Sequence, residues 1–223
     1  ACKDSKGEWV IINGNQTCMI FLYYIITQYR ALGKMTGKEF VVKTIVTTEV
    51  IKEIAEKNNL EMLDCYTGFK WIAREIRLRE GKQTYIGGGE ESYGFLIGDQ
   101  VRDKDAVIAS AMIAEMAAWA KSEGMSLFQL LAHIYTKYGF YKEGLVSIVR
   151  KGNKGQQEIA EMMTNMRNNP PKSLGGSRVA RINDFQSLEC TDTTTSIKTA
   201  INQHKSTVLQ WITESGTVVS ARP

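Results

Sequence analysis

Strand-like and helix-like segments alternate through the first two thirds of the chain, and this alternation constrains the fold more than any other feature. The β-branched run at residues 40–46 predicts a buried strand, and apolar runs at 60–63 and 84–86 predict two more. Apolar residues at helical spacing predict helices, which we place at residues 15–32, 48–58, 67–80, 103–121 and 126–138, with Thr47 or Thr48 capping the second. Such an order is typical of an α/β domain in which helices cover a sheet.

The pattern changes after Tyr138. Residues 139–144 are predicted to be a linker, and alternating apolar residues predict strands, which we place at 145–149, 179–182, 208–213 and 217–221. A helix is expected at 155–168, and residues 191–206 predict a long loop or a weak hairpin. We therefore expect a short hairpin at 1–13, an α/β domain at 14–138, and a small α+β domain with an antiparallel sheet at 139–223.

Composition narrows the class of protein. A formal charge of +4 favours anionic ligands slightly, but it falls short of the clustered basic face expected of a nucleic-acid-binding protein. Only two histidines are present, which disfavours a histidine-based metal site. The apolar segment at 18–26 is shorter than the roughly 20 residues that a membrane span needs, so a buried helix is expected. Four widely spaced cysteines and no signal peptide predict free thiols and a cytoplasmic location.

A glycine-rich segment at residues 86–95 is the first candidate for a binding site. Its three consecutive glycines, Gly87–Gly89, predict a tight turn with close backbone approach rather than a strand interior. Glu90 and Ser92 on such a turn would offer two carboxylate oxygens and a hydroxyl, a set that suits the neighbouring hydroxyls of a sugar. Lys104 could add a positive charge or a proton. The alternative is a solvated acidic turn that follows a strand.

Polar residues follow three of the predicted strands. The glycine segment follows residues 84–86, Thr47 and Thr48 follow the strand at 40–46, and Thr67 with Gly68 follows the strand near 63. Ligands of α/β domains bind beyond the carboxyl ends of the strands. We therefore expect these three strand ends to converge on one face.

The motif Gly89-Glu90-Glu91-Ser92-Tyr93-Gly94, followed by Arg102-Asp103-Lys104-Asp105, resembles the sugar-binding segment in the third domain of the α-D-phosphohexomutases, the phosphoglucomutase and phosphomannomutase family. Residues 42–48 and 67–71 resemble earlier parts of that domain, and residues 216–223 resemble the strand that leads into the fourth-domain phosphate loop. The resemblance implies a mixed sheet covered by helices, then a small α+β domain. The family's phosphoserine loop and Asp-x-Asp-x-Asp metal loop do not occur in this sequence. The chain also starts without methionine and stops after a strand, so we expect a C-terminal half with a truncated fourth domain, in which residues 1–13 are the tail of a preceding domain.

The resemblance also implies roles for single residues. Glu90 and Ser92 fall on the family's Gly-Glu-x-Ser positions, which bind sugar hydroxyls, whereas Glu91 falls on the variable position and is expected to be a surface or locally paired carboxylate. Thr67 and Gly68 match a turn near the substrate. Lys70 is expected either to reach the phosphosugar or to be solvated.

The Arg102-Asp103-Lys104-Asp105 segment is a variant of the family's Arg-Glu-Lys-Asp pattern. This implies that Lys104 is a cationic acid and that Arg102 is a substrate-binding residue. Bacterial phosphomannomutases often carry a histidine where this chain has Gly94, and that departure moves the proton-relay role to Lys104. The alternative is a charge cluster at a helix N-terminus, where Asp103 and Asp105 suit the helix dipole. Arg222 matches the first position of the phosphate loop.

Three functions remain open at this level. The first is the C-terminal part of a phosphohexomutase, which would interconvert hexose 1-phosphate and hexose 6-phosphate with Mg²⁺ and hexose 1,6-bisphosphate. Its phosphoserine, Mg²⁺ ligands and N-terminal domains would lie outside these 223 residues, so the chain alone is expected to be inactive. The second is a non-catalytic sugar-phosphate binding module. The third is an α/β interaction domain without a ligand.

Overall fold

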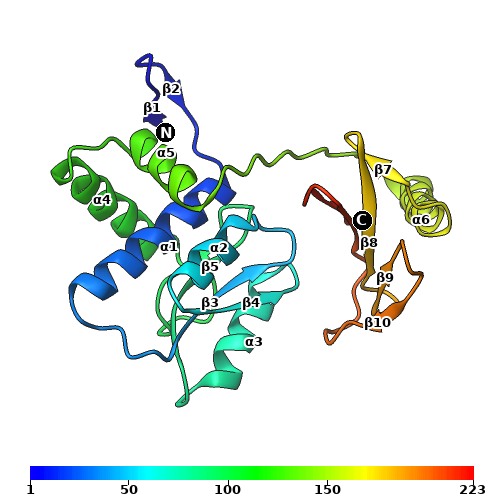
Figure 1. Cartoon of the computed structure of the whole chain (residues 1–223), viewed down its shortest axis with the longest axis horizontal. Helices are drawn as coiled ribbons and strands as arrows, with labels where there is room; N and C mark the ends of the chain where they lie inside the picture. Colours follow the sequence, from blue (N-terminus) through cyan, green and yellow to red (C-terminus); the bar gives the residue numbers. More distant parts are fainter. The chain divides into compact units, whose positions relative to one another are not determined.

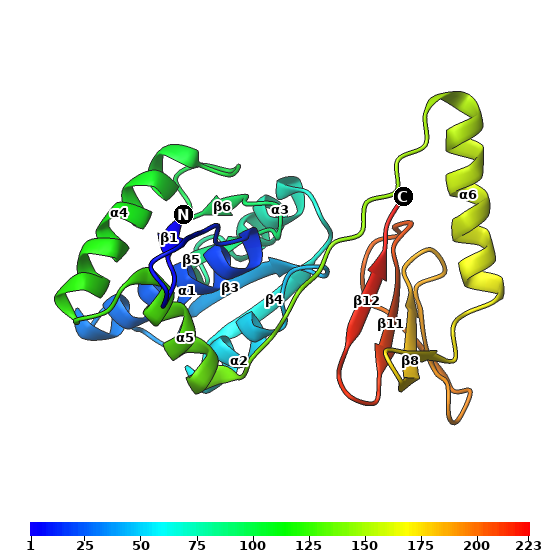
Figure 2. The same ribbon diagram turned by 90° about the horizontal axis from the view of Figure 1, so that it is seen from above.

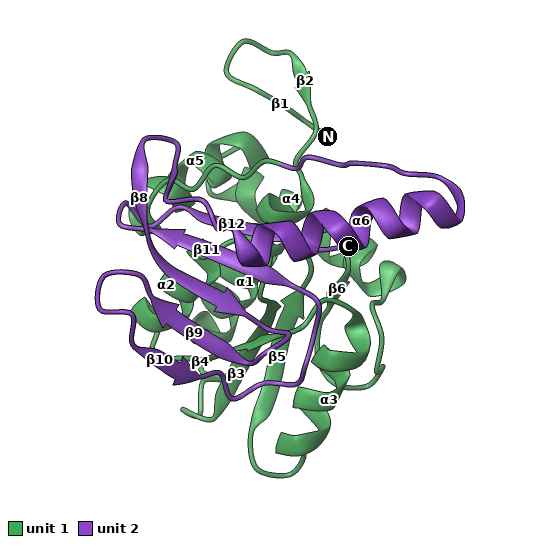
Figure 3. Cartoon of the chain, turned by 90° about the vertical axis from the view of Figure 1, so that its right-hand side faces the viewer, with its two compact units in different colours: residues 1–144 green, residues 145–223 purple.

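The computed structural model describes residues 1–223 and divides into two compact units, Ala1–Gly144 and Leu145–Pro223 (Figure 3). The first unit contains a four-stranded sheet in the order β4-β3-β5-β6. Strands β3 (Glu39–Thr44), β4 (Glu61–Cys65) and β5 (Thr84–Gly89) are parallel, and β6 (Phe95–Leu96) pairs antiparallel with β5. The predicted mixed sheet is therefore confirmed.

Helices cover both faces of this sheet (Figure 1). The helices are α1 (Gly14–Ala31), α2 (Val50–Lys57), α3 (Phe69–Arg79), α4 (Ala106–Ser122) and α5 (Leu127–Tyr138). Val41 and Ile86 pack with α1, α2 and α5, whereas Phe40, Val42 and Tyr85 pack with α3. Successive residues of a strand point to opposite faces, so the continuous apolar run of β3 supplies two separate cores.

Helix α1 is the centre of the larger core. It begins with a capping box, in which the Asn13 side chain accepts from the Gln16 N–H and the Gln16 side chain accepts from the Asn13 N–H. Its side chains from Cys18 to Ile26 are all buried, which confirms the prediction of a core helix there. None of the helices is both long enough and apolar enough to span a bilayer.

The prediction of a glycine turn at residues 87–89 is wrong, because β5 continues through all three glycines. A Cβ atom on Gly88 would lie 2.2 Å from the backbone oxygen of Val42, and one on Gly89 would lie 2.5 Å from the oxygen of Gly94. A Cβ on Gly87 would lie 3.0 Å from the Leu22 side chain of α1. As expected, the glycines allow another group to come close to the backbone. That group is the protein's own neighbouring strand, loop and helix.

Two helix starts also differ from the predictions. Helix α2 begins at Val50 and its N-cap position is Glu49, which makes no side-chain cap bond, whereas the Thr48 hydroxyl accepts from the Val50 N–H at 3.4 Å. Helix α4 begins at Ala106 instead of residue 103, because the Asp105 side chain accepts from the N–H groups of Val107 and Ile108 and so caps it.

The second unit is built on an antiparallel sheet in the order β10-β9-β8-β11-β12, with β7 paired to β8. Its elements are α6 (Gly152–Asn168), β7 (Ser173–Leu174), β8 (Ser177–Asp184), β9 (Glu189–Asp192), β10 (Lys198–Ala200), β11 (Leu209–Thr213) and β12 (Val218–Ala221). Figure 2 shows α6 alongside the sheet, and Met163 of α6 packs against Val179, Leu209 and Trp211. The predicted antiparallel α+β arrangement is confirmed.

Two further segments test the strand predictions. The strand expected at 145–149 is wrong: this segment has no regular secondary structure and its side chains are exposed. β-branched residues favour a strand only where a partner strand and a core are present. Residues 191–206 do contain part of a hairpin, β9 with β10. The N-terminal hairpin is confirmed as β1 (Cys2–Lys3) paired with β2 (Trp9–Val10).

Candidate functional site

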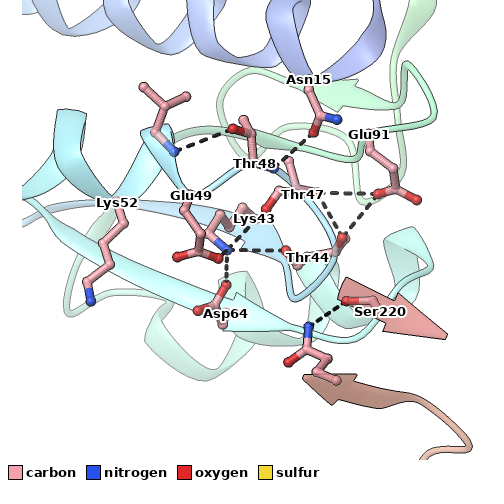
Figure 4. A network of polar contacts seen from close by, with 12 residues as sticks. Asn15, Lys43, Thr44, Thr47, Thr48, Glu49, Lys52, Asp64, Glu91 and Ser220 are labelled. Atoms are coloured by element: carbon pink, nitrogen blue, oxygen red, sulfur yellow. Dashed lines mark hydrogen bonds and ion pairs between the residues drawn. The ribbon is translucent and has the colours of Figure 1, made fainter. Parts of the chain in front are cut away.

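The carboxyl ends of the three parallel strands are tied together by side-chain hydrogen bonds (Figure 4). Beyond β5, one oxygen of the Glu91 carboxylate lies within hydrogen-bond distance of the hydroxyls of Thr44, the last residue of β3, and Thr47, in the following turn, at 3.2 and 3.3 Å. Beyond β4, the Gly68 N–H donates to the carboxylate of Glu90 at 2.6 Å. The predicted convergence of three strand ends on one edge is therefore confirmed.

Glu90 is held in a fixed position at this edge. Glu90 is buried, and its loop is closed by a hydrogen bond of 2.8 Å from the Glu90 N–H to the Gly94 oxygen. Tyr93 within the loop adopts a left-handed backbone with φ of +68°. One carboxylate oxygen takes the bond from Gly68, while the second accepts no hydrogen bond from the protein. The arrangement presents one pre-oriented acceptor oxygen to a ligand that carries hydroxyl donors.

The side chains of Lys104 and Glu90 both pass close to Gly94, which leaves room for them. A Cβ atom on Gly94 would lie 2.9 Å from Oε2 of Glu90 and 3.3 Å from Cδ of Lys104. The Lys104 ammonium lies over the Phe69 ring, 5.5 Å from its centroid, and 3.3 Å from Oδ1 of Asp103. The hydrogen bond from the Lys104 N–H lowers the pKa of Asp103, so this partner stays ionised. The site thus holds a fixed carboxylate and an exposed cation whose side chains both lie beside Gly94.

Three more predicted residues lie along the same edge. Ser92 is exposed in the loop that holds Glu90, and Thr67 is half-buried immediately before Gly68. Gly68 has φ of +107°, a conformation that favours glycine, and it is the N-cap of α3. Lys70 is exposed in the first turn of α3, with its ammonium 5.4 Å from the centroid of the Trp71 ring.

Two predicted residues lie elsewhere. Arg102 pairs with Glu80 at 2.9 Å, and Glu80 is the C-cap of α3. Glu90 accepts a hydrogen bond from Gly68, the N-cap residue at the opposite end of α3. The 11 residues of α3 separate these two helix ends by about 16 Å, so the Glu80 end that Arg102 contacts is remote from Glu90. Arg222 is exposed after β12 and belongs to the second unit. The gathered set is therefore Thr67, Gly68, Lys70, Glu90, Ser92 and Lys104.

Sequence reasoning missed an ionic cluster at this edge, in which a buried lysine meets two partly exposed carboxylates. The Lys43 side chain of β3 is fully buried, and its Nζ lies 2.7 Å from the Asp64 carboxylate and 2.9 Å from that of Glu49. Burial alone would lower the pKa of Lys43, but the two carboxylates outweigh burial and raise it, so the side chain stays charged. A lysine inside the apolar run at 40–46 was the available signal, because a buried charge requires a partner.

The residues of this chain do not fit a magnesium site. No group of three or more His, Cys, Asp or Glu side chains is placed to hold a metal ion. Asp103 is engaged by Lys104, and Asp105 caps α4. The four cysteines are free, and burial raises the pKa of the Cys18 and Cys65 thiols, which keeps them neutral and poorly nucleophilic.

Comparison with known proteins identifies the family. Residues 13–138 match the sequence model for phosphoglucomutase/phosphomannomutase, alpha/beta/alpha domain III. Phosphoglucomutases of Staphylococcus aureus strains bovine RF122 / ET3-1 and MSSA476 are each 35% identical, over 220 and 221 residues, which is 99% of this chain and 39% of theirs. The chain thus spans about two fifths of the length of the curated relatives it matches.

A solved structure shares the fold. The exocytosis-sensitive phosphoprotein pp63/parafusin of Paramecium, a phosphoglucomutase in its open form, matches with a TM-score of 0.57 at 12% identity, over 97% of this chain and 34% of that one. The family match extends over more than half of the present chain. The chain therefore belongs to the phosphoglucomutase/phosphomannomutase family, and residues 13–138 are its third, α/β/α domain.

Proposed function

We propose that this chain is the sugar-recognising part of a phosphohexomutase, an enzyme that interconverts hexose 1-phosphate and hexose 6-phosphate. The observation that supports this most is the Glu90 carboxylate, which accepts a hydrogen bond from Gly68 where the three parallel strands end and which shares the space beside Gly94 with the Lys104 side chain. In this proposal the second oxygen of Glu90 accepts a hydrogen bond from a sugar hydroxyl, and the exposed Ser92 hydroxyl makes a further hydrogen bond to the sugar. Membership of the phosphoglucomutase/phosphomannomutase family supports a hexose phosphate as the ligand.

The cations of the same edge would meet the phosphate groups. Phosphoryl transfer is accelerated mainly by positioning and by neutralising charge on the transferring group. Lys104 is exposed and charged, so in this proposal it donates a proton or stabilises developing negative charge, while Lys70 contributes a second cation. In the second unit, Arg222 would be the first residue of the loop that binds the distal phosphate. Arg102 would bind substrate only after leaving Glu80.

The remaining parts of the reaction would come from outside these residues. Mg²⁺ would supply charge neutralisation at the transferring phosphoryl group, and hexose 1,6-bisphosphate would serve as activator. We infer that the phosphoserine donor and the metal ligands lie in N-terminal domains, within the part of the relatives' length that this chain does not cover. We also propose a cytoplasmic location, in which the four thiols stay reduced.

Substitution of each glutamate in turn shows which of the two, Glu90 or Glu91, binds the sugar. Glu90→Gln should weaken binding of glucose 1-phosphate by roughly tenfold or more, because a hydrogen bond to a charged group contributes about 1.5–3 kcal/mol. Glu91→Gln should change the affinity little, since a glutamine oxygen still accepts from Thr44 and Thr47. Isothermal titration calorimetry on both variants measures the difference. Equal losses would show that the motif has been placed on the wrong carboxylate.

Catalytic turnover by the isolated chain can be measured directly. The 223-residue chain should show no measurable conversion of glucose 1-phosphate to glucose 6-phosphate, even with Mg²⁺ and glucose 1,6-bisphosphate supplied. Phosphoryl transfer needs a donor nucleophile and charge neutralisation, and the chain holds no site that fits the metal. A coupled assay on purified protein, with a mock purification to exclude host mutase, makes the measurement. Sustained turnover above the mock would require a nucleophile within this chain.

A further inference from the structure

The buried ammonium of Lys43 holds the turn that follows β3. Besides the carboxylates of Glu49 and Asp64, its Nζ lies 3.5 Å from the backbone oxygen of Thr44 and 3.4 Å from that of Thr47 (Figure 4). These four acceptors come from the end of β3, the following turn, the N-cap of α2, and β4. One side chain therefore fixes the 44–49 turn against its neighbouring strand.

The same turn carries the hydroxyls that hold Glu91. The hydroxyl oxygens of Thr44 and Thr47 lie 2.8 Å from each other and 3.2 and 3.3 Å from Oε2 of Glu91, so their two protons serve three contacts of hydrogen-bond length. The backbone of Glu91 is confined as well, since a Cβ atom on Gly14 of α1 would lie only 1.9 Å from the Glu91 oxygen. The position of the 44–49 turn thus determines where the chain runs after β5.

Glu91 is adjacent to Glu90 in the loop, so a displacement of Glu91 also moves the binding carboxylate. The N–H groups of Gly68 and Glu90 report this position directly, because one donates to the Glu90 carboxylate and the other to the Gly94 oxygen. Stability alone does not explain a buried lysine here. Replacing buried ion pairs by apolar groups of similar volume is often neutral or stabilising, whereas directional bonds specify one geometry.

We propose that Lys43 is a positioning residue of the hexose-phosphate site. Through Glu49 and Asp64 it fixes the turn whose Thr44 and Thr47 hydroxyls hold the Glu91 side of the loop, and so it places the carboxylate of Glu90. The identity of the ligand rests on the proposed function, but the positioning itself is a property of the fold and is measurable without a ligand.

The test uses Lys43→Met/Asp64→Asn in the 223-residue chain, so that the lost charge leaves no unpaired carboxylate at Asp64. Amide hydrogen exchange by NMR should be at least about tenfold faster at Gly68 and Glu90, measured relative to the helix amides of α5, which report opening of the whole unit. Lys52→Met removes an exposed lysine from the neighbouring α2 and should change neither amide. Thr44→Val/Thr47→Val keeps Lys43 and the side-chain volume, and should reproduce the faster exchange.

Glucose 1-phosphate titration separates the two proposals. If both hold, the Lys43 and threonine variants lose affinity by roughly tenfold, as expected from the loss of a pre-placed charged acceptor. If exchange at Gly68 and Glu90 accelerates but wild-type protein binds no glucose 1-phosphate, the positioning holds and the proposed function fails. If the two amides accelerate no more than those of α5 in both the Lys43 and the threonine variants, the positioning role is overturned.

Discussion

Lys104→Met should lower kcat by on the order of a hundredfold or more while KM changes little, in a complete phosphohexomutase that carries these residues. Methionine keeps most of the stem that passes Gly94 and Phe69, but it removes the ammonium. The charge matters most where negative charge develops during phosphoryl transfer, so its loss is felt in the transition state more than in the bound substrate. Steady-state conversion of glucose 1-phosphate to glucose 6-phosphate provides both constants.

The matched control is Lys82→Met, an exposed lysine in the loop after α3. This variant changes the net charge equally and should leave both constants within about twofold, because the interaction of exposed charges more than about 10 Å apart is largely screened at ordinary salt. A rise in KM with unchanged kcat for Lys104→Met would instead mean that Lys104 binds ground-state substrate and takes no part in the chemical step.

Gly88→Ala should destabilise the first unit by about 3 kcal/mol or more. The new Cβ would lie 2.2 Å from the Val42 oxygen and 2.9 Å from the Tyr85 hydroxyl. Val42 belongs to β3, which is hydrogen-bonded on both sides, so its backbone cannot move without breaking two strand pairings. Urea unfolding followed by circular dichroism measures the change in free energy.

Gly144→Ala is the matched control for this variant. Gly144 has open space around its Cβ position, and its φ is not in the left-handed region, so the change in stability should be within about 0.5 kcal/mol. A Gly88→Ala protein as stable as the control would show that β3 and β5 separate readily enough to admit a side chain. The three glycines would then have no packing role.

Local sequence determined the order of the elements and much of the site. The apolar run at 40–46 and the helical spacing around it predict strand and helix because periodicity depends only on near neighbours in the chain. The parallel arrangement then places Thr44, Gly68 and Glu90 at one edge, since parallel strands all end on the same side. The Gly-Glu-x-Ser motif indicates Glu90 as a binding residue, and the fixed position of the Glu90 carboxylate agrees with that role.

Other features were decided only by contacts between residues far apart in sequence. The glycines of β5 extend as a strand because they pair with β3, and they are glycines because Leu22 and Val42 leave no room for side chains; no local pattern encodes either proximity. The segment at 145–149 carries a strand pattern yet has no partner strand, so it forms none.

The ion pairs of the charged side chains also depend on contacts between residues far apart in sequence. Lys43 finds Glu49 and Asp64 beneath the strand ends, whereas Arg102 finds Glu80 at the far end of α3. Which opposite charge lies within 4 Å depends on how strands and helices pack, and burial then determines how strongly the pair interacts. The sequence alone thus determined which residues could perform chemistry, and the tertiary structure decided which of them meet.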